Sequence, residues 1–374
     1  MFASSTNELK MLDMAAAEFA RKQLAANNQE NDKYPFGPFF DSVLHKAYEV
    51  DFFHTILPEA LGGMQQGMHA LCTILDNVCR ADSSLGGIIF TNTFAQKIIL
   101  SANGEKLLQS IVSSAADAKR LLIAYPVFNN PTEVETKVQA IKTAGKYILS
   151  GNLEYLVLGG IAAHAVIPAK IKGQSNFSFF IIDLSDDRVL KSDPVLSLGF
   201  HACPAVDVTF NHAEGKLLGD TAKGNTYFNR ASDVMHVAAA SISAGIMKGA
   251  YKEALDYSQN RFQGGREIFN WSEIQMILAN MAIKVKIAEM VIAQACQAVD
   301  YMFSGWRLYS HAAAIHVSEM ACEVTTDGIQ VLGGVGYMED YGQAKRYRDA
   351  KQAQCLLGIA PMKKIRYLGN LISN

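Results

Sequence analysis

Two short motifs carry the side chains best suited to holding a phosphate-bearing ligand. In Arg261-Phe-Gln263-Gly-Gly an arginine precedes a glycine pair, and Gln330 precedes a second pair, Gly333 and Gly334. A guanidinium fork pairs with two phosphate oxygens at once, and glycine lets a ligand approach the backbone closely. Both motifs therefore suit a pyrophosphate. The plainer interpretations are an arginine that pairs with an acidic neighbour and glycines that only end a helix.

The cysteines, by contrast, indicate neither a metal site nor a disulfide framework. None of them has the CxxC or CxxH spacing that a zinc site needs. They stand at Cys72, Cys79, Cys203, Cys296, Cys322 and Cys355. We expect no bound metal, and scattered thiols of this kind are typical of a reducing cytoplasm.

The composition of the chain excludes further classes of function. Its 374 residues suffice for two or three domains, and 34 Lys and Arg against 36 Asp and Glu give a net charge of −2. General nucleic-acid binding therefore lacks its usual electrostatic basis. The start of the chain has no basic or apolar leader pattern, and the most apolar stretch, 156–169, is short and contains His164. We expect no signal peptide, no membrane span and a cytoplasmic location.

Hydrophobic periodicity divides the chain into three parts that must position these motifs. Residues 1–118 have a helical period, beginning with a capping-box pattern at Ser5-x-x-Glu8. Residues 119–224 have a period of two in short runs, which predicts an antiparallel β-barrel or sandwich. In residues 225–374 the helical period returns, which predicts a four-helix bundle. The four segments are roughly 225–260, 270–304, 308–331 and 345–372. The predicted fold class is mainly α with a central β domain.

This order of parts resembles the acyl-CoA dehydrogenase family along nearly the whole chain. Beside the two motifs above, four other stretches are similar to family motifs: Pro58-Glu-Ala-Leu-Gly-Gly63, Leu218-Gly-Asp, Leu278-Ala-Asn-Met-Ala282 and Arg348-Asp-Ala-Lys351. The resemblance implies FAD as the cofactor and an acyl-CoA thioester as the substrate. In the family a glutamate removes the α proton of the substrate while the β carbon delivers a hydride to the flavin.

The resemblance also implies a division of the flavin site between two subunits. Arg261, Gln263, Gln330, Gly333 and Gly334 match residues that contact the adenine and pyrophosphate end of an FAD held mainly by the neighbouring subunit. Tyr155 matches the tryptophan that stacks on the flavin ring. For CoA, Asp233 matches an aspartate of the family, and His236 replaces an arginine. Histidine keeps some polarity but loses the constant charge, and the alternative interpretation is a core histidine on an apolar helix face.

Around the flavin ring and the thioester the sequence departs from the family pattern. Leu357 stands where the catalytic glutamate is expected, and Met235 stands at the alternative position of the base used by a few members. Neither side chain accepts a proton, and Asp233 nearby is a weak substitute because it matches the CoA contact. Where the family has Trp-Ile-Thr, the chain has Tyr155-Leu-Val157, and valine cannot hydrogen-bond to the flavin. The catalytic residues therefore stay unknown.

Three further departures fall in the same region. The flavin-binding loop Thr-Glu-Pro-x-x-Gly-Ser-Asp of the family has become Ala124-Tyr-Pro-Val-Phe-Asn-Asn130. The phenylalanine of the Arg-x-x-Phe-Gly motif is Gly264, and the threonine after the catalytic glutamate is Ile359. The adenine end is thus retained while the ring end is depleted.

From this asymmetry we expect one subunit of a heteromeric acyl-CoA dehydrogenase that lends half an FAD site to a related catalytic subunit. A heterotetramer of this kind would associate through the helical bundle, with electron transfer flavoprotein as the usual electron acceptor of the family. Two alternatives stay open. One is a self-sufficient homotetramer with an unrecognised base, and the other is a cofactor-free acyl-CoA-binding or scaffold protein.

Overall fold

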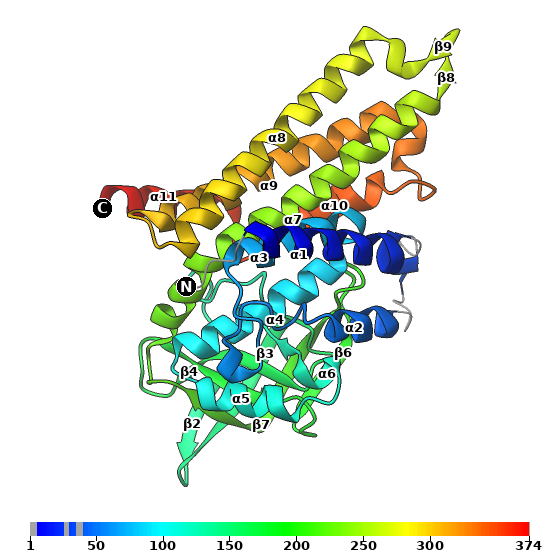
Figure 1. Ribbon diagram of the computed structural model, residues 1–374. Helices are drawn as coiled ribbons and strands as arrows, with labels where there is room; N and C mark the ends of the chain where they lie inside the picture. Colours follow the sequence, from blue (N-terminus) through cyan, green and yellow to red (C-terminus); the bar gives the residue numbers. More distant parts are fainter. Residues whose placement is uncertain (1–5, 26–29, 35–39, 374) are drawn as a thin grey trace.

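The computed structural model describes residues 6–25, 30–34 and 40–373, so Ser5 of the expected capping box lies outside the described residues. A helical part, a β part and a long helical bundle follow one another along the chain, as the sequence predicts (Figure 1). The predicted fold class, mainly α with a central β domain, is therefore confirmed.

The first part packs helices against the β domain. Its α-helices are α1 (Thr6–Phe19), α2 (Phe40–Glu49), α3 (Met68–Ala81), α4 (Ser83–Ser101), α5 (Glu105–Ser114) and α6 (Ala118–Leu121). A π-helical turn (Ala20–Leu24) and short 3-10 turns (Glu30–Asp32, Glu59–Leu61) complete it. Helix α4 begins at the cap Asp82, whose carboxylate accepts a hydrogen bond from the Ser84 N–H at 2.7 Å. Helix α4 is buried along most of its length, and its buried Asn92 and Gln96 amides donate to the Phe53 carbonyl.

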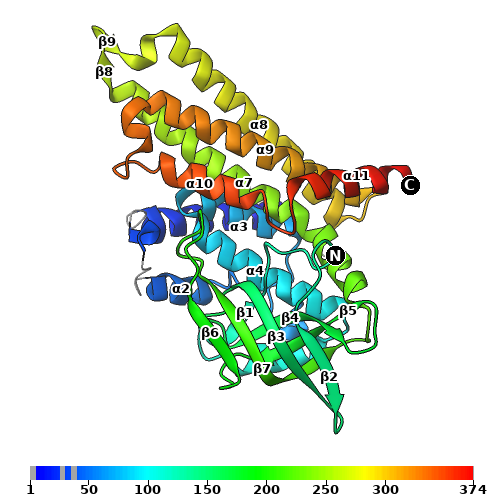
Figure 2. The same cartoon turned by 180° about the vertical axis from the view of Figure 1, so that it is seen from behind.

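The β part is a closed barrel. Its strands are β1 (Ile123–Ala124), β2 (Gln139–Thr143), β3 (Lys146–Val157), β4 (His164–Ile171), β5 (Phe177–Asp183), β6 (Val189–Pro194) and β7 (Ala205–Leu218). Pairing runs from β4 through β2, β3, β7 and β5 back to β4, which closes the ring (Figure 2). The prediction of an antiparallel barrel is confirmed for most of the strand pairs. Strand β4 pairs in parallel with β1 and β2. The chain between β2 and β4, which includes β3, provides the crossover connection that a parallel pair needs.

The third part is a bundle whose last helix is broken. Helices α7 (Gly224–Asn260), α8 (Ser272–Asp300) and α9 (Trp306–Leu332) agree with the predicted segments to within a few residues. The fourth segment, predicted as one helix over 345–372, is two helices, α10 (Gln343–Ala353) and α11 (Ala360–Ser373). Leu357 and Gly358 between them have φ of +64° and +123°, which a right-handed helix cannot contain. The single-helix prediction is therefore wrong.

A small hairpin lies at the outer tip of the bundle. Strands β8 (Phe262–Gln263) and β9 (Arg266–Glu267) pair between α7 and α8, followed by a 3-10 turn (Ile268–Asn270), and another 3-10 turn (Gly333–Tyr337) follows α9. The hairpin and the β-barrel occupy opposite ends of the molecule in both views (Figures 1 and 2).

Candidate functional site

A cavity of about 420 Å³ opens at the outer end of the bundle, between the β8–β9 hairpin and the C-terminal end of α9. Arg261, Gln263 and Gly333 all line it, so the structure brings together three of the five residues expected at the adenine end. Gly334 follows Gly333 and Gln330 lies three residues before it, but neither lines this cavity. Trp271 and Glu273 complete its polar and aromatic wall.

The backbone at this cavity explains its glycines. Gly264 and Gly265 have φ of +67° and +88°, the two positive values that a tight two-residue hairpin turn requires. Gly333 ends α9 with φ +64° and ψ −138°, and its N–H donates to the Gln330 carbonyl. A Cβ at Gly333 would meet nothing within 4 Å. Gly333 therefore caps the helix and also leaves its backbone open to a ligand.

Arg261 offers its guanidinium without a protein partner. Its side chain is exposed and forms no ion pair or hydrogen bond with any residue in the described part of the chain. Its backbone is fixed, since the Arg261 N–H donates to the Tyr257 carbonyl at 2.9 Å and the Arg261 carbonyl accepts from the Ile268 N–H at 2.8 Å. The arginine is thus anchored by its main chain and free at its head group.

A second cavity, of about 450 Å³, is lined by Tyr155 on strand β3 and by Gln352 on α10, so it lies where the barrel meets the bundle. The Tyr155 hydroxyl accepts a hydrogen bond from the Gln352 amide at 2.7 Å, and its N–H donates to Asp207 at 2.8 Å. Phe128 packs edge-on against the Tyr155 ring, with centroids 5.5 Å apart. The ring expected to stack on a flavin is therefore held in one orientation, with φ of +58° at its backbone.

The loop 124–130 forms hydrogen bonds with Leu357, which stands where the family has its catalytic glutamate. The Leu357 N–H donates to the Val127 carbonyl at 2.9 Å, and the Asn130 amide donates to the Leu357 carbonyl at 3.2 Å. Leu357 and Val157 are each only 1% exposed. Backbone groups of a loop that binds flavin in the family are used here within the chain, and the side chains of Leu357 and Val157 themselves offer neither a proton acceptor nor a donor.

A carboxylate that the sequence analysis missed lies beside this turn. A Cβ at Gly358 would lie 2.9 Å from both carboxylate oxygens of Glu133. Glu133 accepts a hydrogen bond from the Asn130 amide at 2.9 Å and lies 3.7 Å from the Arg366 guanidinium. The carboxylate is therefore engaged as an anchor between the loop and α11. The signal for it was weak, because a single glutamate after a Pro-Thr pair is usually a surface charge.

The two residues expected to contact CoA lie inside the bundle. Asp233 on α7 accepts hydrogen bonds from His311 at 2.9 Å and Arg307 at 3.0 Å, so cationic or polar partners already occupy both of its oxygens. The His236 ring packs against His311, with centroids 4.1 Å apart, and is 2% exposed. Its Nδ1 has no hydrogen-bond partner among the described residues. Burial, together with the charges of His311, Lys363 and Arg366, holds the pKa of His236 well below its ordinary value, so the imidazole is neutral.

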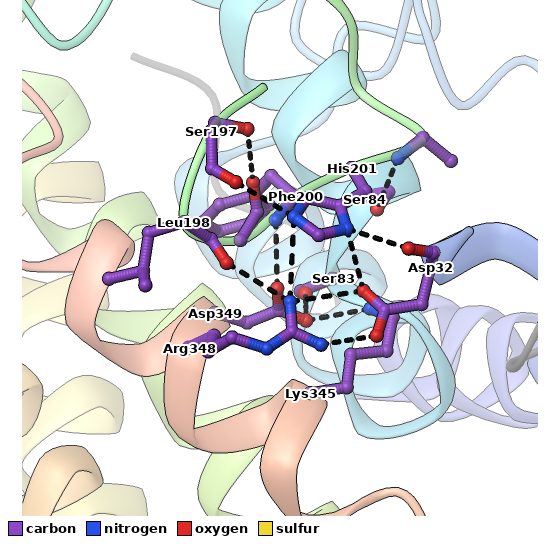
Figure 3. A network of polar contacts seen from close by, with 12 residues as sticks. Asp32, Ser83, Ser84, Ser197, Leu198, Phe200, His201, Lys345, Arg348 and Asp349 are labelled. Atoms are coloured by element: carbon purple, nitrogen blue, oxygen red, sulfur yellow. Dashed lines mark hydrogen bonds and ion pairs between the residues drawn. The ribbon is translucent and has the colours of Figure 1, made fainter. Parts of the chain in front are cut away.

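The Arg348-Asp-Ala-Lys motif joins the three parts of the chain (Figure 3). Asp349 accepts from the Phe200 N–H at 2.8 Å and pairs with Lys345 at 2.7 Å, and Ser83 at the start of α4 donates to the same carboxylate. Arg348 pairs with Asp32 and donates to the Leu198 carbonyl at 3.0 Å. This motif therefore positions the bundle against the barrel and the helical part.

Within residues 6–25, 30–34 and 40–373, no group of three or more His, Cys, Asp or Glu side chains is placed to hold a metal ion. In the same residues, no helix has both the length and the apolar character needed to traverse a bilayer.

Comparisons with known proteins match two parts of the chain to the domains of one family. The N-terminal domain of acyl-CoA dehydrogenase matches residues 6–116, and the C-terminal domain of the same family matches residues 222–362. Cyclohex-1-ene-1-carbonyl-CoA dehydrogenase of Syntrophus aciditrophicus is 24% identical over 94% of this chain and 87% of its own length. The caffeyl-CoA reductase-Etf complex subunit CarC of Acetobacterium woodii is 25% identical over the full length of both chains.

A solved chain from work on the electron transferring flavoprotein of Acidaminococcus fermentans superposes with a TM-score of 0.91, at 25% identity over 99% of both chains. The two domain matches together cover most of the chain, and they correspond to its first helical part and its helical bundle. The chain belongs to the acyl-CoA dehydrogenase family.

Proposed function

We propose that this chain is a subunit of an FAD-dependent acyl-CoA oxidoreductase, in which it supplies the adenine-end half of a flavin site to a related subunit. The observation that carries the proposal is the separation of the two half-sites. Arg261 lines the cavity beside the β8–β9 hairpin, at the outer tip of the bundle, whereas Tyr155 lines a second cavity together with Gln352 of α10, and no residue lines both. We infer from this separation that the flavin whose adenine end lies at the hairpin is completed by a second subunit.

The two ends fit FAD unequally. At the adenine end, an unpaired guanidinium and an open glycine backbone suit a pyrophosphate. At the ring end, Val157 provides no hydrogen-bond donor, and Leu357 and Met235 are buried apolar side chains. FAD would supply the hydride acceptor for desaturation of the acyl-CoA thioester, and the proton acceptor for that reaction would come from the partner subunit. This chain would bind and orient the nucleotide end.

The electron-carrying partner that we propose is an electron transfer flavoprotein. A full-length relative is named as a subunit of a caffeyl-CoA reductase-Etf complex, which supports this choice. The acyl group stays open, since Met235 and Leu357 are buried and neither lines either of the two cavities described above.

A second candidate is a self-sufficient homo-oligomeric flavoprotein. It is favoured by the cavity of about 450 Å³ at Tyr155, whose oriented ring could stack on a flavin without a partner's help.

The visible absorption spectrum of the purified chain tests the two candidates. Expressed alone, the chain should be colourless, and co-expressed with a genetically adjacent homologue it should yield one FAD per two chains. The variant Arg261→Gln should lower the flavin content of the co-purified assembly without changing its circular dichroism, because Arg261 has no protein partner among the described residues. Arg120→Gln, at another exposed arginine, is the matched control. One FAD per chain in the absence of any partner would establish the second candidate instead.

A further inference from the structure

We propose that helix α11 and the turn between α8 and α9 form a surface that binds the headgroup region of an anionic membrane. The helix would lie in the plane of the membrane surface and would not cross it. The inference does not depend on the flavin site proposed above, because no residue of α11 or of this turn lines the hairpin cavity or the Tyr155 cavity.

Helix α11 has its apolar side toward solvent, the reverse of an ordinary surface helix. Two of its basic side chains are held by protein groups. Lys363 is 7% exposed and donates to the Gln354 carbonyl at 2.8 Å. Arg366 donates to the Thr132 hydroxyl at 2.7 Å. The apolar side chains recur every three or four residues, so they form one stripe, and they are 37–77% exposed: Met362, Ile365, Leu368, Leu371 and Ile372.

The turn between α8 and α9 adds exposed aromatic side chains at the same end of the bundle. Tyr301, Met302 and Phe303 are 39–60% exposed, and the rings of Tyr301 and Phe303 stack with centroids 6.0 Å apart. Tyr309, in the first turn of α9, is 44% exposed. Both views place this turn and α11 together, away from the β8–β9 hairpin (Figures 1 and 2). Aromatic rings with a polar tip beside an aliphatic stripe are typical of a membrane–water interface.

The charges of the two segments are complementary to an anionic surface. Residues 301–318 and 360–374 contain four Lys or Arg and no Asp or Glu, although the whole chain has a net charge of −2. The side chains of Arg307 and Lys364 are more than half exposed, while each also pairs with one carboxylate, Asp233 or Glu319. A basic helix with an apolar face binds a membrane through both its buried area and its attraction to anionic lipids.

The same charges argue against a symmetric contact between two copies of this surface. In such a contact the identical patch of each copy would meet the other, so the basic side chains would face one another. Like charges brought together across an interface are unfavourable. A lipid surface of opposite charge covers the apolar stripe without this cost.

Co-sedimentation of the full chain with lipid vesicles tests the inference. The chain should pellet with vesicles of phosphatidylcholine and phosphatidylglycerol, and much less with vesicles of phosphatidylcholine alone. The double variant Ile365→Glu and Leu368→Glu should bind the anionic vesicles about tenfold more weakly or less, because it places two carboxylates in the stripe. The matched control is Leu190→Glu with Leu196→Glu, at two apolar side chains of similar exposure on the barrel side, and it should bind like the wild type.

The inference is overturned if the folded wild-type chain stays in the supernatant with anionic vesicles, or if the double variant of α11 pellets equally well. A double variant that sediments as a smaller species, with no vesicle binding by the wild type, would also overturn it and would assign the stripe to a contact between protein subunits. The flavin content of the co-expressed assembly should be the same for the wild type and the double variant. Its value tests the shared-site function separately from the membrane surface.

Discussion

Lys345 lies between two carboxylates where the three parts of the chain meet. Its ammonium is 2.7 Å from Asp349 and 3.6 Å from Asp82, and the residue is 5% exposed. Replacing it by methionine keeps most of the volume but leaves both carboxylates buried without their cation. We expect Lys345→Met to lower the free energy of unfolding by about 3–5 kcal/mol, measured by urea denaturation.

The control for this prediction is an ion pair of the same type at the surface. Lys22 pairs with Glu18, and both side chains are more than half exposed. Lys22→Met should change the free energy of unfolding by less than about 1 kcal/mol. Equal effects of the two substitutions would contradict the role assigned to Lys345.

The Asp32–His201 contact makes part of the stability depend on pH. Burial alone would raise the pKa of Asp32, but hydrogen bonds from His201 and Arg348 outweigh it and hold that pKa well below its ordinary value. Burial alone would lower the pKa of His201, but the hydrogen bonds and charge of Asp32 outweigh it and raise the pKa above its ordinary value. The histidine contribution is therefore fully present below the pKa of unfolded histidine and is lost as pH rises through the raised value.

Urea denaturation of the wild type and of His201→Asn at a series of pH values checks this sign. Between pH 6 and pH 9 the wild type should lose stability relative to the variant, whose asparagine does not titrate. At strongly acidic pH the wild type should lose stability again, as Asp32 becomes protonated. A constant difference between the two proteins over pH 6–9 would contradict the assignment.

Single residues of the site were predictable where this sequence retains the residues of a family motif. Arg261, Gln263 and Gly333 line one cavity because their motifs lie at the adjoining ends of α7 and α9. Trp271 was missed, although the loss of an aromatic residue at Gly264 was a signal to look for a replacement nearby. The partners of Asp233 were also beyond prediction, since His311 and Arg307 reach it from a different helix.

At the scale of elements, the break between α10 and α11 depends on Gly358. Its φ of +123° is open only to glycine, and a Cβ there would approach the Glu133 carboxylate to 2.9 Å. We expect Gly358→Ala to lower the free energy of unfolding by about 1–3 kcal/mol, measured by urea denaturation.

Gly369 provides the opposite case within the same pair of helices. It lies in α11, and a Cβ there would meet nothing within 4 Å. Gly369→Ala should therefore stabilise the chain by about 0.5–1 kcal/mol through better helix propensity. If both substitutions lowered the free energy of unfolding, the effect at position 358 would not be specific to the backbone conformation of the break.

Hydrophobic periodicity predicted most helices and strands, because their buried positions follow the period of the element. It failed where the buried positions do not follow that period. The bundle helices α7, α8 and α9 alternate apolar and polar faces over many turns, so their bounds were found. Strand β6 carries no alternating pattern, because only Val189 of its six residues is buried. The break at Leu357 was missed because leucine carries no sign of a left-handed backbone. Parallel pairing of β1 and β2 with β4 is a tertiary arrangement that local patterns do not encode.

At the scale of the whole molecule, helix α8 exposes a stripe of apolar side chains. Met276, Ile283, Ile287 and Met290 fall on a single stripe of this helix and are 38–67% exposed. Apolar side chains gathered in this way mark an interface between proteins. We expect a second subunit to pack there, so the double variant Ile283→Glu and Met290→Glu should sediment as a smaller species than the wild type while its circular dichroism is unchanged.

Gln109→Glu, an added charge on the exposed side of α5, is the control and should leave the sedimentation coefficient of the assembly unchanged. A wild-type chain that sediments as a monomer at all concentrations would remove the basis of this prediction.

The separation of the hairpin cavity from the Tyr155 cavity has a consequence for inheritance. Under the proposed function, a change at Arg261 removes flavin from a site that the partner subunit's gene largely encodes, whereas a change beside Tyr155 leaves that flavin in place. A defect at Arg261 would therefore resemble the loss of the partner's gene. An intact copy of this chain's gene would restore activity, and an extra copy of the partner's gene would not.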